Sequence, residues 1–184
     1  TFGKFALDIL GARTGPDDEA RRILNGLIRP FGMLDTFLRD EVDYVLSRFE
    51  PGSLEDYVGV QRDGRGASPR MDAATRRRLL NEVVYPYVKQ KKAKGLVDWN
   101  DIAVNAGRKS ADPWDVVIVD ESQDFSANQV RTILRHLSPD HSVTFVVDAA
   151  QRIYPRSFTW KEAGITTLTS KALTRNHRNT RQIA

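Results

Sequence analysis

Apolar residues recur at helical spacing through the first half of the chain. One stripe spans 34–49 and stops at Pro51 and Gly52, which predicts a helix that ends there. Residues 17–29 predict an earlier helix, because acidic residues occupy its first turn and Pro30 lies just beyond its end. The first half of the chain is therefore expected to be helical.

A third helix is expected to start near Asp72. Pro86 lies inside its pattern and should kink or split it, because proline lacks the backbone donor. Before this helix, residues 59–70 are rich in glycine and polar side chains and predict a loop. The expected buried face of the helix consists of Leu79, Leu80, Val83, Val84, Tyr87 and Val88.

The second half alternates between strand and helix patterns. Residues 116–119 form a continuous apolar run, which is typical of a strand covered on both faces. A capping-box signature at 126–129 begins a helix, and residues 143–147 form a second apolar strand. The apolar face of that helix is expected to hold Val130, Ile133, Leu134 and Leu137. Strand, helix and strand at this spacing predict a right-handed βαβ unit with parallel strands, so the expected fold class is α/β.

Composition narrows the class of protein. A chain of 184 residues with 40% hydrophobic and 28% charged residues is expected to form one globular domain, or one domain with an insertion. The longest aliphatic run is too short to span a bilayer, and the sequence shows no signal peptide, so no membrane partner is expected. The absence of cysteine excludes disulfides and cysteine-bound zinc and suits a cytoplasmic protein.

Basic residues are concentrated in one stretch, although the formal net charge is only +4. Residues 61–94 contain ten basic residues against three acidic ones. Such a stretch can meet a polyanion through phosphate contacts, whereas the alternative is an ordinary solvated helical face. The ten are Arg62, Arg65, Arg70, Arg76, Arg77, Arg78, Lys89, Lys91, Lys92 and Lys94.

Acidic residues follow both predicted strands. Asp120 and Glu121 come directly after the first strand, and Asp148 follows the second. Parallel strands end at the same edge of a sheet, which is where open α/β sheets bind ligands. Hydrolysis of a nucleoside triphosphate needs a carboxylate near Mg²⁺ and a base that orients water, and Asp120 and Glu121 suit these two roles. The alternative is a pair of solvated acids at the start of a loop.

Two later residues suit the same chemistry. The amide of Gln151, just past the second strand, is placed to touch a γ-phosphate and to report its loss. Arg178 offers a fixed cation of the kind that stabilises a transferring phosphoryl group. Each residue, taken alone, is equally typical of a solvated or salt-bridged surface position.

Five strings occur along the chain: "TFGKFALDIL" at 1–10, "LVDWNDI" at 96–102, "VVIVDESQD" at 116–124, "VVDAAQRIY" at 146–154 and "LTRNHRN" at 173–179. In this order they resemble the UvrD/Rep-like helicases of superfamily 1. The third string is similar to the Walker B motif of that family. The fourth resembles motif III, with Val147 where glycine is common, and the fifth resembles motif IV, with His177 in the usual Tyr position. Gly3 replaces a histidine in the first string.

The resemblance implies an ATP-dependent DNA helicase that uses Mg²⁺. It implies Asp120 at the metal, Glu121 as catalytic base, Gln151 as γ-phosphate sensor and Arg178 as γ-phosphate contact. Gln123 and His177 are further expected ATP contacts, the histidine by stacking on the adenine. The expected contacts to single-stranded or duplex DNA are Trp160, Tyr154, Thr1, Arg76, Arg77 and Arg78. Trp160 is expected to stack on a base, and its alternative role is that of a partly buried core anchor.

The sequence contains no Gly-x-x-x-x-Gly-Lys-Ser/Thr loop to bind the β- and γ-phosphates. The chain is therefore expected to be a fragment of a longer helicase, with a partial RecA-like P-loop NTPase sheet and a helical insertion, and to be inactive alone. Its expected parts are the end of the first segment of the motor domain (1–30), the DNA-contacting helical insertion (31–110), and motor domain carrying Walker B, motif III and motif IV (111–184). The alternative function is a non-catalytic DNA-binding or interaction module on a decayed ATPase scaffold.

Overall fold

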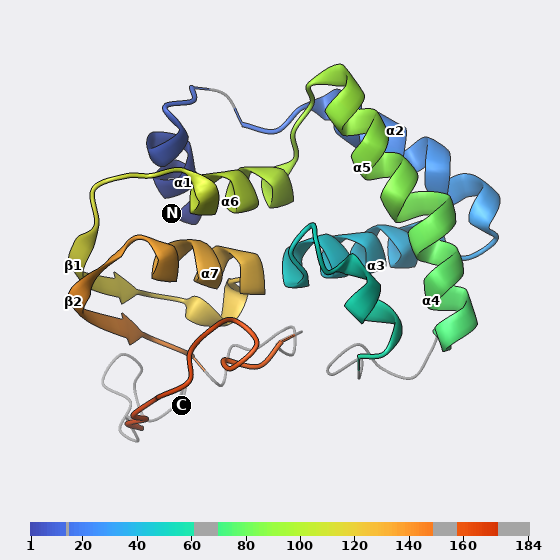
Figure 1. The fold of residues 1–184 in the computed structure, drawn as a ribbon. Coiled ribbons are helices and arrows are strands. Elements are labelled where there is room, and N and C mark those ends of the chain that lie inside the picture. Colours follow the sequence, from blue (N-terminus) through green and yellow to red (C-terminus); the bar gives the residue numbers. More distant parts are fainter. Residues whose placement is uncertain (14, 61–69, 149–157, 173–184) are drawn as a thin grey trace, which may run out of the picture.

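The elements of the chain fall into two groups in the computed structural model, which describes residues 1–13, 15–60, 70–148 and 158–172 (Figure 1). One group, on the right in the figure, is all-helical and contains α2 (Asp18–Ile28), α3 (Asp35–Arg48), α4 (Ala73–Leu79) and α5 (Tyr85–Lys94). The other group contains β1 (Trp114–Val119), β2 (Leu137–Phe145), α1 (Phe2–Leu10), α6 (Trp99–Arg108) and α7 (Ala127–Arg135). Short 3-10 turns lie at Arg29–Phe31, Leu54–Val58 and Ser122–Asp124.

The all-helical group buries one continuous apolar core. The helices predicted over 17–29 and 34–49 are confirmed as α2 and α3, to within one or two residues at each end. Ile28 of α2 is fully buried in the same cluster as Leu38 of α3 and Leu80. The packing therefore groups α2 with α3, α4 and α5. None of the helices in the described ranges combines the length and the apolar character needed to cross a membrane.

Pro86 splits the helix that begins after Asp72, as its sequence position predicted. A π-helical turn over Leu80–Val84 separates α4 from α5, and within it the Tyr85 N–H donates to the Leu80 carbonyl five residues back. Because proline has no N–H for the carbonyl four residues before it, the wider turn shifts the hydrogen-bond ladder just ahead of Pro86. The predicted face is buried at Leu79, Leu80, Val83, Val84 and Tyr87, and Val88 is half-buried.

β1 and β2 pair in parallel, so the chain is an α/β protein, as predicted. The register shifts between Trp114, which pairs with Leu137, and Val116, which pairs with Ser142. β2 thus begins earlier than the expected 143–147 segment and carries an irregularity near its start. Leu137 was predicted on the apolar face of the helix, and this was wrong, because α7 ends at Arg135 and Leu137 already belongs to β2.

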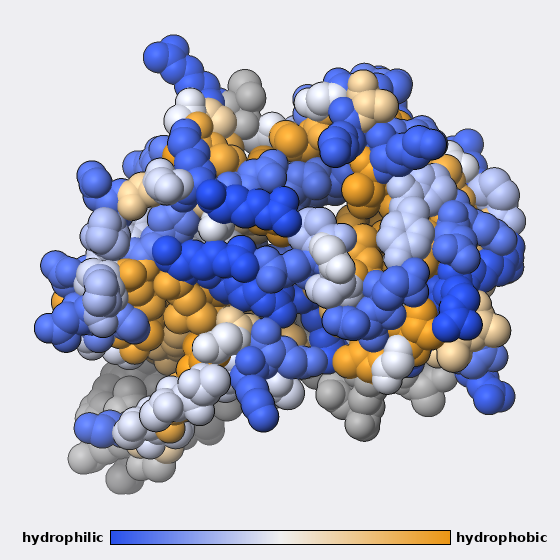
Figure 2. Space-filling view, viewed as in Figure 1, coloured by the Kyte–Doolittle hydropathy of each residue, from blue (hydrophilic) through white to orange (hydrophobic). Residues whose placement is uncertain are grey.

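The prediction that both faces of the first strand are covered was also wrong. Val119 is buried and Val117 is half-buried, whereas Val116 and Ile118 are 69% and 72% exposed. Alternate residues of a strand point to opposite faces, so one face meets the rest of the chain and the other meets solvent. Figure 2 shows hydrophobic surface over the region of the two strands. An apolar run of four residues does not tell which neighbours are available to cover it.

α6 and α7 cross closely at Gly107 and position the site described below. A Cβ added at Gly107 would lie 2.7 Å from Thr132 Oγ1, so only glycine fits without a shift. The predicted capping box at the start of α7 is confirmed: Ser126 Oγ accepts from the Gln129 N–H at 3.3 Å, and Gln129 Oε1 accepts from the Ser126 N–H at 2.9 Å. This cap fixes the point at which the chain leaves the turn after β1 and enters α7.

Candidate functional site

The turn after β1 carries the acidic residues that the sequence singled out. Asp120 and Glu121 are both exposed, and the Glu121 N–H donates to Asp120 Oδ1 at 2.9 Å. Glu121 has φ of 50°, in the left-handed region that non-glycine residues seldom adopt. Strained backbone of this kind is often found at functional sites, where the surrounding structure holds it in place.

The end of β2 holds this turn in place. The Ser122 N–H and hydroxyl both donate to the Val146 carbonyl, at 2.9 and 2.7 Å. The Asp148 N–H donates to Gln123 Oε1 at 3.0 Å, and Gln123 Nε2 donates to the Glu121 carboxylate. The structure therefore brings the Asp120–Glu121 turn and Asp148 to one edge of the sheet, as parallel pairing predicted.

Four predicted site residues lie outside the described part of the chain: the expected ATP contacts Gln151, His177 and Arg178, and the expected DNA contact Tyr154. Their roles stay predictions.

Asp120 fits a Mg²⁺ site of the kind that uses few protein ligands. No group of three or more His, Asp or Glu side chains within the described ranges is arranged to hold a metal ion. Mg²⁺, however, is commonly held by one or two carboxylates together with water and substrate phosphates. An exposed carboxylate at the end of a strand, with one oxygen turned to its neighbour's N–H, leaves the other oxygen for such a role.

The three arginines predicted to contact DNA have different surroundings. Arg76 is half-buried and donates to the carbonyls of Met71 and Tyr57 at 2.9 and 3.1 Å. Arg78 pairs with Glu82 at 2.8 Å. Arg77 is exposed, and its side chain has no hydrogen bond or ion pair to any residue that the structure describes. Of the three, Arg77 is the one whose charge is available to a phosphate.

Two further expected DNA contacts, Thr1 and Trp160, lie in the described part of the chain and contact neighbouring residues there. Thr1 is exposed and caps α1, since its Oγ1 accepts from the Lys4 N–H at 3.5 Å. Trp160 is half-buried, and its ring centroid lies 4.9 Å from that of Phe145 and 6.3 Å from that of Phe158. This is the environment of a partly buried core anchor, with part of the indole left exposed. Stacking of Trp160 on a base stays a prediction.

Trp160→Ala should lower the stability of the chain. Truncating a buried aromatic side chain costs about 3–5 kcal/mol, and the partial exposure of Trp160 makes about 2–3 kcal/mol a reasonable expectation. Urea unfolding measures this loss, with Trp160→Phe as the milder control. The affinity of the folded variant for single-stranded DNA tests base stacking. An unchanged affinity would rule out stacking of Trp160 on a base.

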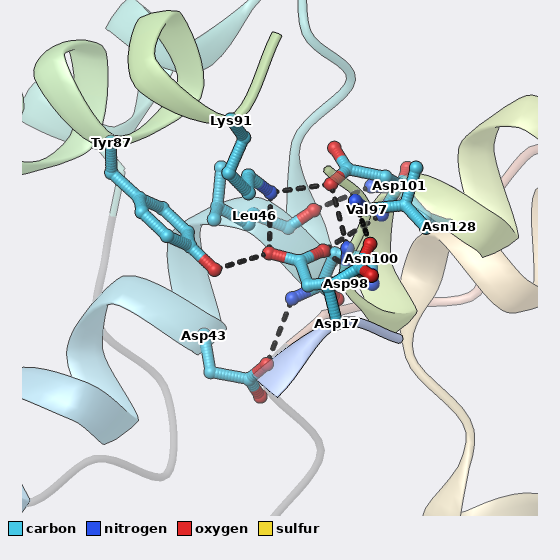
Figure 3. Close-up of polar contacts among 10 residues, drawn as sticks. All are labelled: Asp17, Asp43, Leu46, Tyr87, Lys91, Val97, Asp98, Asn100, Asp101 and Asn128. Atoms are coloured by element: carbon cyan, nitrogen blue, oxygen red, sulfur yellow. Dashed lines mark hydrogen bonds and ion pairs between the residues drawn. The ribbon is translucent and has the colours of Figure 1, made fainter. Parts of the chain in front are cut away.

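A buried ionic cluster, which the sequence did not reveal, joins the two groups of elements (Figure 3). Lys91 of α5 is only 2% exposed, and its Nζ lies 2.5 Å from Asp98 Oδ2 and 2.5 Å from Asp101 Oδ2 at the start of α6. The Tyr87 hydroxyl donates to Asp98 Oδ2 at 2.9 Å. Lys91 had been counted with the basic residues that can meet a polyanion, and this was wrong, because it is buried between two carboxylates.

Asp98 also caps α6. Its Oδ1 accepts from the N–H groups of Asn100 and Asp101, both at 2.9 Å, and Asp101 Oδ2 accepts from the Asp98 N–H at 2.9 Å. Burial pushes the pKa of Asp98 upward, but the charge and hydrogen bond of Lys91, together with hydrogen bonds from the Asp101 N–H and the Tyr87 hydroxyl, outweigh burial and lower the pKa. Burial and the charge of Asp98 raise the pKa of Asp101. The Lys91 ammonium thus pairs with two partly buried carboxylates, and it stabilises the charge of Asp98 more than that of Asp101.

The two segments that connect the groups run side by side at this cluster. The Asp17 N–H donates to the Val97 carbonyl at 2.9 Å, and the Val97 N–H donates to Asp17 Oδ2 at 3.0 Å. Asn100 Nδ2 donates to Asp43 Oδ1 of α3 at 2.9 Å (Figure 3). The residues of the "LVDWNDI" string therefore form the junction between the helical group and the strand-containing group.

A second set of contacts fastens the end of α3 to α7 and to the turn after residue 158. Asn128 Nδ2 donates to the Leu46 and Phe49 carbonyls, both at 2.9 Å. Arg48 is buried, and its Nη2 lies 2.5 Å from Glu162 Oε1. Burial favours a higher pKa for Glu162, but the Thr159 N–H and Arg48 outweigh it and lower the pKa. The two groups are thus joined at two separate places.

Most of the chain matches a known protein family. Residues 49–174, more than half of the chain, match the UvrD/REP helicase N-terminal domain. The chain belongs to this family. Curated proteins and solved structures gave no significant match. The match spans the third and fourth strings in full, so the turn after β1 and the end of β2 both lie within the matched domain.

Proposed function

We propose that this UvrD/REP-family chain forms part of an ATP-dependent DNA helicase that couples ATP hydrolysis to movement on single-stranded DNA. The observation that carries the proposal is the acidic turn Asp120–Glu121, hydrogen-bonded to the end of the neighbouring parallel strand, in a member of this family. The edge of the sheet at which parallel strands end is the usual ligand edge of α/β proteins. In this proposal the chain belongs to a longer polypeptide, the complete helicase.

In the proposed reaction, Glu121 orients the attacking water and takes its proton. Asp120 would hold Mg²⁺, which when bound neutralises charge on the phosphates. Gln151 and Arg178 are the proposed contacts to the γ-phosphate, and His177 the proposed stacking partner of the adenine. The left-handed backbone at Glu121 fixes where its side chain leaves the turn.

The proposal requires parts that this sequence does not contain. A phosphate-binding loop with its lysine would have to be supplied by the complete helicase, and the sheet would then be RecA-like. We further propose that the helical insertion begins near residue 17 and ends near residue 97. Packing supports these limits, because α2 lies in the core of the all-helical group, whereas α6 packs against α1 and α7.

DNA is the second proposed partner, and the outer surface of α4 and α5 is its proposed contact. The exposed, basic residues there favour phosphate contacts, which are insensitive to sequence and weaken with salt. Lys91 and Arg76 take no part, because both are committed to partners within the chain.

Arg77→Ala should weaken DNA binding without loss of stability. Loss of one phosphate contact to a single strand flattens the slope of log affinity against log salt by about 0.7. Fluorescence anisotropy with a labelled oligonucleotide over a salt series measures this slope. Arg76→Ala is the matched control: it should lower the melting temperature, since it leaves backbone carbonyls unpaired, and leave the slope as it was. The reverse pattern would contradict the proposed DNA surface.

The helicase activity itself is tested by strand displacement. The complete helicase is expected to unwind a partial duplex with a single-stranded tail only when both ATP and Mg²⁺ are present. Displacement that needs no ATP, or binding of the tail without any displacement, would speak against the proposal.

A further inference from the structure

We infer that Gln123 is a positioning residue that sets the orientation of the Glu121 carboxylate according to the position of the chain that follows β2. This inference rests on the proposed function. Gln123 is only 9% exposed and bridges two parts of the site. Its Nε2 donates to Glu121 Oε2, and its Oε1 accepts from the Asp148 N–H at 3.0 Å.

The two contacts together fix which way the amide faces. A carboxylate can only accept a hydrogen bond, and a backbone N–H can only donate one. A flipped amide would place Oε1 against the Glu121 carboxylate and Nε2 against the Asp148 N–H, so both contacts would become repulsive. Gln123 therefore has a single favourable orientation, with its donor on the proposed base and its acceptor on the second strand's end.

Within the part of the chain that the structure describes, Gln123 supplies the hydrogen bond that restrains the Glu121 carboxylate. Glu121 is exposed, and the backbone contacts of the turn hold only its main chain. Hydrogen bonds from Ser122 to the Val146 carbonyl keep the turn against β2, while Gln123 connects the Glu121 carboxylate to the residue that follows that strand's end. A shift of Asp148 would draw the amide with it and turn the carboxylate.

Asp148 is the residue at which the string "DAAQRIY" begins, and that string contains Gln151, the proposed γ-phosphate contact. The bridge thus connects Asp148, the first residue of this string, to the proposed base. Both ends of the Gln123 amide are occupied and little of the side chain is exposed, so this role replaces the direct ATP contact expected from the family resemblance.

Two substitutions separate the two contacts. Gln123→Ala removes both, whereas Gln123→Glu keeps an oxygen for the Asp148 N–H and removes the donor to Glu121. Amide hydrogen exchange in the ¹⁵N-labelled chain measures the contact between the Asp148 N–H and Gln123 Oε1. Exchange at Asp148 should become about three- to tenfold faster in Gln123→Ala, the equivalent of one typical hydrogen bond, and stay slow in Gln123→Glu. The Val146 N–H, which donates to the Val119 carbonyl at 2.8 Å, is the internal control and should not change.

ATP hydrolysis by the complete helicase tests the contact between Gln123 Nε2 and the Glu121 carboxylate. Both variants should lower kcat about ten- to hundredfold, the usual effect of removing a hydrogen bond that orients a functional carboxylate, with KM for ATP unchanged. A raised KM at normal kcat would mean that Gln123 contacts the nucleotide, and normal values of both would mean that it orients nothing; either result overturns the inference. A wild type that does not hydrolyse ATP would overturn the proposed function itself, and the exchange measurement would still report whether the bridge exists.

Discussion

Glu121→Gln should abolish ATP hydrolysis by the complete helicase and leave ATP binding intact. Removing a positioned general base slows a reaction by about 10²- to 10⁴-fold. Glutamine has the size of glutamate, and its Oε1 can still accept from Gln123 Nε2, so the turn after β1 should persist. The amide, however, cannot take a proton from water. Single-turnover phosphate release measures the loss, and titration with a fluorescent ATP analogue measures binding.

Asp140→Asn is the matched control for this variant. It makes the same acid-to-amide change at an exposed residue near the start of β2, away from the strand end that carries the site. Its hydrolysis should equal that of the wild type. A Glu121→Gln protein that no longer bound the analogue would assign Glu121 to the metal or to the fold, and one that still hydrolysed ATP would assign the base elsewhere.

Lys91→Met should cost about 3–5 kcal/mol of unfolding free energy, the usual effect of removing one partner from a buried ion pair. Methionine fills much of the space, but it leaves Asp98 and Asp101 close together without a cation. Lys92→Met is the matched control, because it makes the same change at an exposed position of the same helix and should alter the free energy by less than about 0.5 kcal/mol. Urea unfolding of the 184-residue chain measures both.

The cost of Lys91→Met should also depend on pH. In the wild type the pKa of Asp98 is lowered by Lys91, so this carboxylate stabilises the fold above its ordinary pKa of 3.8, and the contribution is lost as the pH falls through the lower folded value. In the variant the two carboxylates lack a cation, so protonation of one of them removes the repulsion between their charges. The difference in unfolding free energy between wild type and variant should therefore be largest at neutral pH and smaller in acid. A difference that did not vary with pH would contradict the charged state of the cluster.

Local pattern predicted the helices well and the sheet less well, for a physical reason. Helical spacing depends on one face of one element, so α2 and α3 were found to within one or two residues. The coverage of a strand depends on what packs against each face, and the apolar run at 116–119 did not reveal that one face is exposed. The irregularity that moves Leu137 into β2 likewise arises from pairing with β1, which lies more than 20 residues earlier.

In the candidate site, too, some residues could be placed from the sequence and others could not. Asp120, Glu121 and Asp148 could be placed at one edge because parallel strands end on the same side, and the hydrogen bonds between the two ends agree. Lys91 could not be recognised as buried, because its partners cap the following helix and a lysine in a basic stretch is typical of a solvated face. The carboxylates of "LVDWNDI", which stand just after the basic stretch, were the one signal that could have indicated the cluster.

Steady-state ATP hydrolysis with and without single-stranded DNA tests the central claim most directly, namely that this chain supplies the metal carboxylate and the base of a DNA-driven ATPase. The complete helicase should hydrolyse ATP with Mg²⁺, and single-stranded DNA should stimulate it. The 184-residue chain alone should hydrolyse none, because its sequence has no phosphate-binding loop. DNA-stimulated hydrolysis by the chain alone, or its absence from the complete helicase, would contradict the account, and the second result would favour a non-catalytic DNA-binding module.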